Sequence, residues 1–117
     1  MAKGLSLVLG VVLFAVGVIG AFTGGHDHTF ILFGVNFSHN LVHILSGVAA
    51  LAAVAGGEKY AKLYCLIFGA VYGIVAVAGF LNIAVVVQLL NLNMADNFLH
   101  VAIAAVCLFV GATAKTA

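Results

Sequence analysis

Charged residues and proline are scarce in this sequence. Asp, Glu, Lys and Arg together make up 6% of the 117 residues, proline is absent, and the formal net charge is +1. The positive residues are four scattered lysines, so the chain has no basic patch of the kind that binds nucleic acid. Nucleic acid is therefore excluded as a partner. With no proline present, we expect no helix to carry a proline kink.

Cysteine is also rare. Cys65 and Cys107 are the only two cysteines, and each lies within an apolar run. A thiol in such surroundings behaves as a small hydrophobic side chain. The sequence therefore favours two free thiols that pack in helices over a disulfide.

Apolar residues are what the chain has in excess. They make up 66% of the sequence, and the mean hydropathy is +1.34, far above the range of water-soluble domains. A membrane-spanning helix needs about 20 mostly apolar residues. The sequence predicts four such helices, at about residues 5–22, 38–55, 61–82 and 97–114. We therefore expect an all-α integral membrane four-helix bundle in a single transmembrane domain, with the first helix retained rather than cleaved as a signal peptide.

The lysines predict the orientation of the bundle. Lys3 precedes the first helix, Lys59 and Lys62 lie between the second and third, and Lys115 follows the fourth, whereas the connections at residues 23–37 and 83–96 contain no lysine. Lysine accumulates on the cytoplasmic side of membrane proteins. Both termini are therefore expected in the cytoplasm.

An internal repeat is visible when the chain is aligned with itself. Residues 36–43 match residues 93–100, with asparagine, asparagine and histidine at the same spacings of four and three. Each copy opens the second helix of a helix pair. The sequence thus predicts two parallel two-helix repeats, at about residues 1–57 and 58–117.

The repeated motif places polar side chains on one face of each helix, because residues three and four apart are neighbours on a helix surface. Its members are Asn36, Asn40 and His43 in the first repeat and Asn93, Asn97 and His100 in the second. The first asparagine of each copy is expected to cap its helix. The favoured interpretation gives the remaining four a structural role, as hydrogen-bonding groups between helices.

Two cofactor hypotheses stand beside that structural role. His43 and His100 have the symmetry expected of facing ligands to a haem or another pigment in a helix bundle. Alternatively, a transition metal would suit the imidazole and carboxylate groups gathered at the same end, since such ligands bind zinc, copper and iron. That second set comprises His26, His28, His39 and Asp96. The sequence favours the absence of a cofactor over both hypotheses.

Two segments carry a further resemblance, residues 33–43 (FGVNFSHNLVH) and residues 92–100 (LNMADNFLH). In these segments, and over nearly its whole length, the chain resembles a bacterial family of small four-helix membrane proteins that carry a domain of unknown function. The resemblance implies the same topology in a bacterial cytoplasmic membrane. It leaves the activity open.

The expected function follows from the absence of catalytic motifs and from the apolar connections between the helices. No nucleophile with a base and no phosphate-binding loop is present, so we expect no enzyme. The connections contain apolar runs at residues 30–33 and 85–90, which predict interfacial segments, helix extensions or surfaces covered by a partner. The leading hypothesis is an accessory or structural subunit of a larger membrane complex. Cofactor binding and self-assembly into a homo-oligomer are the alternatives, so the expected partners are the lipid bilayer and other membrane subunits or copies of this chain.

Overall fold

The computed structural model describes residues 1–23, 27–30 and 33–115, and of Phe30 it describes the backbone alone. Within these residues the chain forms five helices and two short strands. They are α1 (Ala2–Phe22), β1 (His28–Phe30), β2 (Phe33–Val35), α2 (Phe37–Gly56), α3 (Glu58–Phe80), α4 (Ala84–Leu90) and α5 (Met94–Thr113). The helices α1, α2, α3 and α5 are long and apolar enough to cross a membrane. This confirms the predicted all-α architecture with four membrane-length helices.

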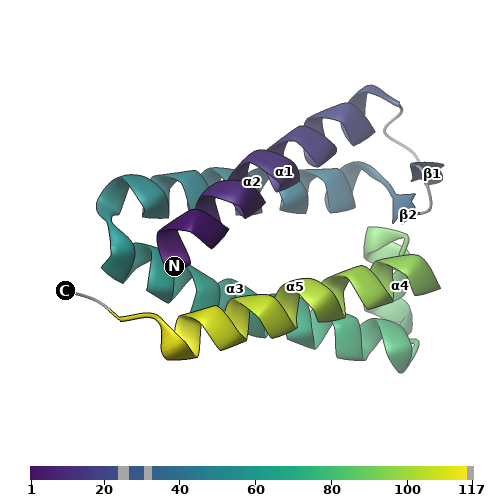
Figure 1. The fold of residues 1–117 in the computed structure, drawn as a ribbon. Helices are drawn as coiled ribbons and strands as arrows, with labels where there is room; N and C mark the ends of the chain where they lie inside the picture. The colour runs from purple at the N-terminus through teal and green to yellow at the C-terminus, as the bar shows by residue number, and fades with distance from the viewer. Residues whose placement is uncertain (24–26, 31–32, 116–117) are drawn as a thin grey trace.

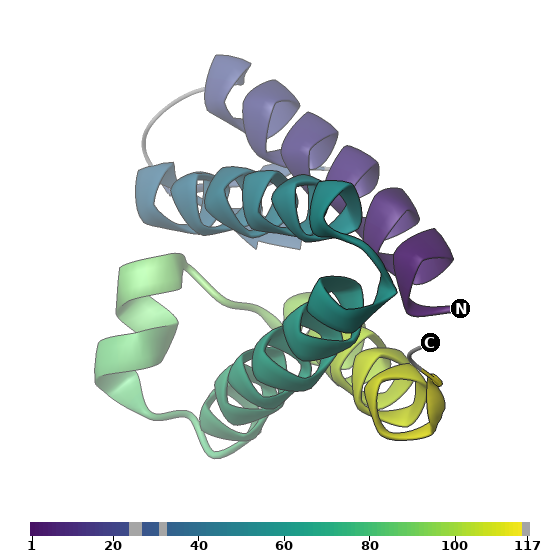
Figure 2. The same cartoon turned by 90° about the vertical axis from the view of Figure 1, so that its left-hand side faces the viewer.

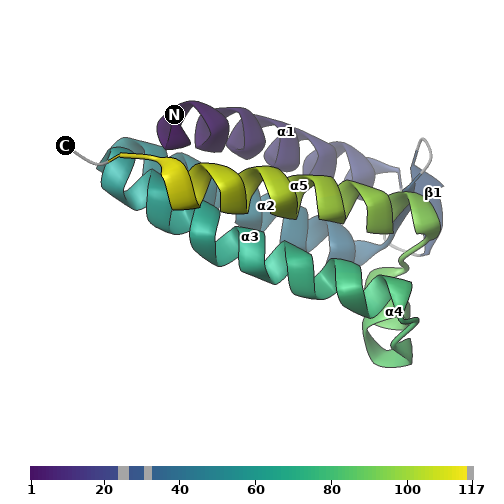
Figure 3. The ribbon, with the colours of Figure 1, turned by 60° about the horizontal axis from the view of Figure 1, so that its bottom comes forward.

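The long helices are arranged as two pairs. Helix α1 packs along α2, and α3 packs along α5, so that the pairs form two layers (Figures 1 and 2). The start of α1, the end of α5 and the turn between α2 and α3 lie at one end of the bundle (Figure 1). The strands and α4 lie at the other end, where α4 runs across the direction of the long helices (Figure 3).

The turn between the two pairs depends on glycine. Helix α2 ends at Gly56, and Gly57 has a φ of 107°, which lies in the left-handed region that only glycine adopts without strain. The next helix begins at once with Glu58. The predicted end of the second helix, at about residue 55, thus lies within one residue of the observed end.

Side-chain contacts close this end of the bundle. Glu58 of α3 accepts hydrogen bonds from the backbone N–H groups of Ala2 (2.6 Å) and Lys3 (3.2 Å) in the first turn of α1. Lys62 donates to the carbonyl oxygen of Ala114 after α5 (2.7 Å). These bonds satisfy helix-end groups that have no partner within their own helix.

The connections at the opposite end contain more regular structure than the sequence predicts. Strands β1 and β2 pair as an antiparallel hairpin. Of the predicted apolar run at residues 30–33, residues 31 and 32 lie outside the described residues. The second apolar run forms α4, in which Val85 and Leu89 are exposed. Helix α5 begins at Met94, three residues before the predicted start, because Asn93 and Asp96 form a capping box there.

Large apolar side chains point outward, whereas small and polar side chains lie inside. Ile74 of α3 and Phe109 of α5 are 70% and 67% exposed, while His39 and Asp96 are each 1% exposed. Apolar surface of this extent is unfavourable in water but favourable in lipid. The chain is therefore a small membrane protein whose apolar helices contact the bilayer.

A candidate metal centre

Two asparagines set where α2 and α5, the helices that carry the clustered histidines, begin. The side chain of Asn36 accepts a hydrogen bond from the backbone N–H of His39 (3.0 Å), and Asn93 accepts one from that of Asp96 (2.9 Å). Asparagine is among the best N-caps because its oxygen satisfies a free N–H of the first turn. The caps fix the starts of α2 and α5, and the histidines project from the first two turns of these helices.

In each helix pair, a second asparagine lies directly against a glycine. A Cβ atom added at Gly20 would overlap the Oδ1 atom of Asn40, and one added at Gly79 would overlap that of Asn97. Glycine thus lets the paired helices approach closely. Within the described residues, the Asn40 amide and the Asn97 amide oxygen have no hydrogen-bond partner. The contact that the structure shows for these two side chains is packing against glycine.

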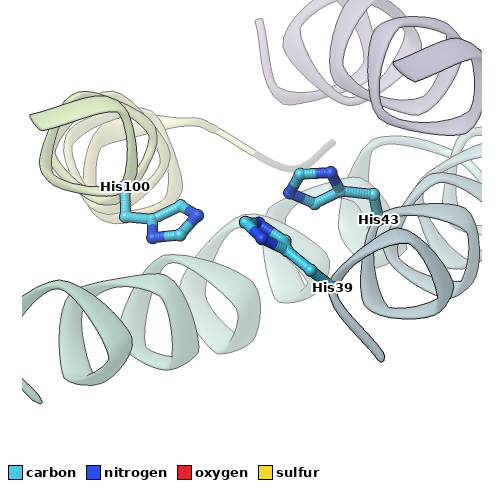
Figure 4. Close-up of side chains that lie close together, drawn as sticks. All are labelled: His39, His43 and His100. Atoms are coloured by element: carbon cyan, nitrogen blue, oxygen red, sulfur yellow. The ribbon is translucent and has the colours of Figure 1, made fainter. Parts of the chain in front are cut away.

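Three histidines meet between the two pairs. His39 and His43 come from successive turns of α2, and His100 reaches them from α5 (Figure 4). The ring centroid of His39 lies 4.4 Å from that of His43 and 5.7 Å from that of His100, and the last two are 6.4 Å apart. All three side chains are buried. They form a histidine cluster in which one ring nitrogen from each residue lies within 4.8 Å of the others.

Most of the nitrogens in this histidine cluster lack a hydrogen-bond partner. The Nδ1 atom of His39 lies 2.9 Å from the carbonyl oxygen of Leu90 at the end of α4. Within the described residues, His39 Nε2, both nitrogens of His43 and Nδ1 of His100 have none. Buried polar atoms are nearly always paired, and leaving one unpaired costs about 1–3 kcal/mol. Such unpaired donors and acceptors point to a bound species that satisfies them.

The histidine cluster fits a single transition-metal ion. Zinc–imidazole bonds of about 2.0–2.1 Å place tetrahedral ligand nitrogens about 3.4 Å apart, so the present nitrogens need to approach by at most about 1.4 Å. The hydrogen bond from His39 Nδ1 to a backbone carbonyl is the second contact that metal-ligating histidines usually make.

A macrocycle fits less well than an ion. The His39 ring lies close to both His43 and His100, in the space that a porphyrin between those two residues would occupy (Figure 4). Haem ligation by facing histidines needs that space for the macrocycle. The geometry therefore favours an ion over a haem or pigment ring.

Among the described residues, the other predicted ligands are not part of the histidine cluster. His26 is outside the described residues. His28, in β1, contacts the Thr23 hydroxyl at 2.5 Å. Asp96 accepts hydrogen bonds through Oδ2 from the backbone N–H groups of Gly34 (3.0 Å) and Asn93 (2.9 Å), which fastens the hairpin to α5. The structure thus joins His39 to the His43–His100 pair and leaves Asp96 a structural contact.

Comparisons with known proteins add the family. No curated protein and no solved structure gives a significant match to the chain. The family described as a domain of unknown function (DUF4383) matches residues 3–113. The match includes the histidine cluster and all four membrane-length helices, except the first residue of α1. The chain therefore belongs to the DUF4383 family, a domain of unknown function.

Proposed function

We propose that this small membrane protein binds one transition-metal ion through His39, His43 and His100. The observation that carries the proposal is the meeting of three buried imidazoles whose ligand atoms lie within 4.8 Å of one another. Neutral imidazole nitrogens are good ligands for zinc, copper and iron. Three protein ligands leave one tetrahedral position open, which is the arrangement of metal sites that bind a further molecule.

Elemental analysis of gently purified protein tests this proposal. We expect about one zinc, copper or iron per chain, and an absorption spectrum distinguishes an ion from a haem or pigment. The double variant His43→Ala, His100→Ala should lose the metal, because a single imidazole remains. His28→Ala is the matched control, since His28 lies outside the histidine cluster. Circular dichroism checks that each variant keeps its helices.

Two results would contradict metal binding. Protein that is isolated free of metal and takes up none when incubated with zinc or copper would remove the proposal. Equal metal content in the wild type and the double variant would place the metal elsewhere. Either result would indicate that the three histidines have only a structural role in packing.

We also propose that the histidine cluster lies in the outer half of the membrane. All four lysines belong to the start of α1, the start of α3 or the residues after α5. These segments lie at the end of the bundle opposite the hairpin (Figure 1), and lysine favours the cytoplasmic side. Cysteine introduced at the exposed residue Asp27, in a background with Cys65→Ala and Cys107→Ala, should react with a membrane-impermeant thiol reagent in intact cells. Cysteine at Lys59 should react only after the membrane is opened, and the reverse pattern would refute this orientation.

A second candidate function is that of a subunit in a larger membrane assembly. It is favoured by α4, whose apolar residues Val85 and Leu89 are 71% and 58% exposed at the end of the bundle. Such a surface suits either the membrane interface or a protein partner. Mass spectrometry of the complex released from native membranes distinguishes foreign subunits, copies of this chain and a monomer. A monomer that retains nothing would contradict this function.

A further inference from the structure

A cavity of about 180 Å³ adjoins the histidine cluster. Its walls are almost entirely apolar and come from α1 (Val12 and Val16), from β2 (Phe33 and Val35) and from α5. His43 lies in the wall, so an ion held by His43 is next to the cavity. An apolar space of about 150 Å³ can take up a small apolar molecule such as benzene. The cavity thus provides room for a small ligand next to the proposed metal.

The cavity lies next to the outer surface of α1. Val12 lines it and is also 48% exposed on that surface, where the helix faces the bilayer. The short way from the bilayer to the cavity therefore passes Val12, an apolar side chain. Ions and strongly polar molecules would have to give up their hydration on this route, at a cost of several kcal/mol.

The second polar residue in the wall is held in place by the backbone. Asp96 lines the cavity together with His43, and its Oδ2 atom accepts two backbone hydrogen bonds. Almost all of the remaining wall is apolar. Such walls favour a small uncharged molecule over an ion.

From these features we infer that the proposed metal ion binds an uncharged diatomic molecule, of the class of carbon monoxide or nitric oxide, that reaches it from the bilayer through this cavity. The inference rests on the proposed function, because the metal is the point of attachment. Binding is simple coordination, in which a lone pair of the diatomic forms a dative bond to the open metal position and no bond breaks. The open position follows from the three-histidine ligand set.

Carbon monoxide with the copper(I) protein is the probe. Protein in lipid nanodiscs is loaded with copper(I) without oxygen, and infrared spectroscopy follows the band of metal-bound carbon monoxide. Val16→Phe fills the cavity, and Val11→Phe is the matched control, because Val11 is 55% exposed on the same helix and is not part of the wall. We expect one carbon monoxide per copper in the wild type and in Val11→Phe, and at least tenfold weaker binding in Val16→Phe at unchanged copper content.

The outcomes separate the two proposals. If copper is bound but the wild type gives no carbon monoxide band, or if Val16→Phe binds as well as Val11→Phe, the cavity does not serve the metal and this inference fails alone. If no copper is bound, the metal proposal fails and this inference fails with it. Should Val16→Phe not fold, the milder Val16→Leu gives the same comparison, with an expected intermediate loss of binding.

Discussion

His39 Nδ1 lies 2.9 Å from the carbonyl oxygen of Leu90. A carbonyl oxygen only accepts hydrogen bonds, so the proton of the neutral imidazole is on Nδ1 and the lone pair is on Nε2. Helix α4 thereby orients a residue of α2 and leaves its Nε2 atom, which has no hydrogen-bond partner among the described residues, for a metal ion. The short helix at the end of the bundle is thus part of the proposed metal site.

Nitrogen NMR tests this tautomer directly. In metal-free protein with labelled histidine, His39 is expected to be protonated at Nδ1 and unprotonated at Nε2. Addition of zinc should shift the Nε2 signal of His39 and leave its Nδ1 proton in place, because only Nε2 is free to coordinate. A proton on Nε2 in the metal-free protein would mean that the contact with Leu90 does not set the tautomer.

Gly79→Ala should destabilise the bundle. A Cβ atom at this position would overlap the side chain of Asn97, which is buried and has little room to move. Overpacking of this kind costs about 1–3 kcal/mol in the free energy of unfolding. Reversible unfolding in mixed detergent micelles, followed by circular dichroism, measures the change.

Gly73→Ala is the control on the same helix. A Cβ atom there would lie 3.6 Å from that of Ala104, which is an ordinary contact. Its stability should remain within about 0.5 kcal/mol of the wild type. Equal losses in the two variants would show that the contact between Gly79 and Asn97 has no special role.

The sequence predicts the spanning helices and their caps well, for physical reasons. A helix in lipid must be long and apolar throughout, so composition alone reveals it. Asn36 and Asn93 are recognisable as caps because the cap is a local interaction, made within three residues. The internal repeat stays a prediction, although both pairs carry the same contact between asparagine and glycine.

The elements at the hairpin end and the full histidine cluster are harder to predict. Helix α4 has only seven residues, too few for a periodic pattern to distinguish it from an apolar loop. His39 shares a helix face with His43, which the spacing of four shows, but its distance from His100 depends on how α2 and α5 approach each other. That approach is a tertiary property, and the sequence grouped His39 with His26, His28 and Asp96 instead.

Asp96→Ala should be strongly destabilising. The substitution leaves the backbone N–H groups of Gly34 and Asn93 without their acceptor and detaches the hairpin from α5. We expect a loss of about 2–3 kcal/mol in the free energy of unfolding. Asp27→Ala is the control, since Asp27 is exposed and accepts a bond from the Asn36 side chain at the surface. A smaller loss for Asp96→Ala than for Asp27→Ala would contradict this role.

Tyr64→Phe tests the contact that joins the two helix pairs. The buried Tyr64 hydroxyl of α3 donates to the carbonyl oxygen of Ser46 in α2 (2.9 Å). Hydrogen bonds between membrane helices contribute about 0.6 kcal/mol on average, so the variant should lose about 0.5–1 kcal/mol in the free energy of unfolding.

Tyr60→Phe separates this hydrogen bond from the general effect of removing a hydroxyl. Tyr60 precedes Tyr64 by one turn of α3 and is 53% exposed, so its replacement should leave stability unchanged. Neither variant should alter zinc affinity, because neither tyrosine belongs to the histidine cluster. If Tyr64→Phe weakened zinc binding while Tyr60→Phe did not, the two helix pairs would be coupled, and the spacing of α2 and α5 at the histidines would depend on this distant contact.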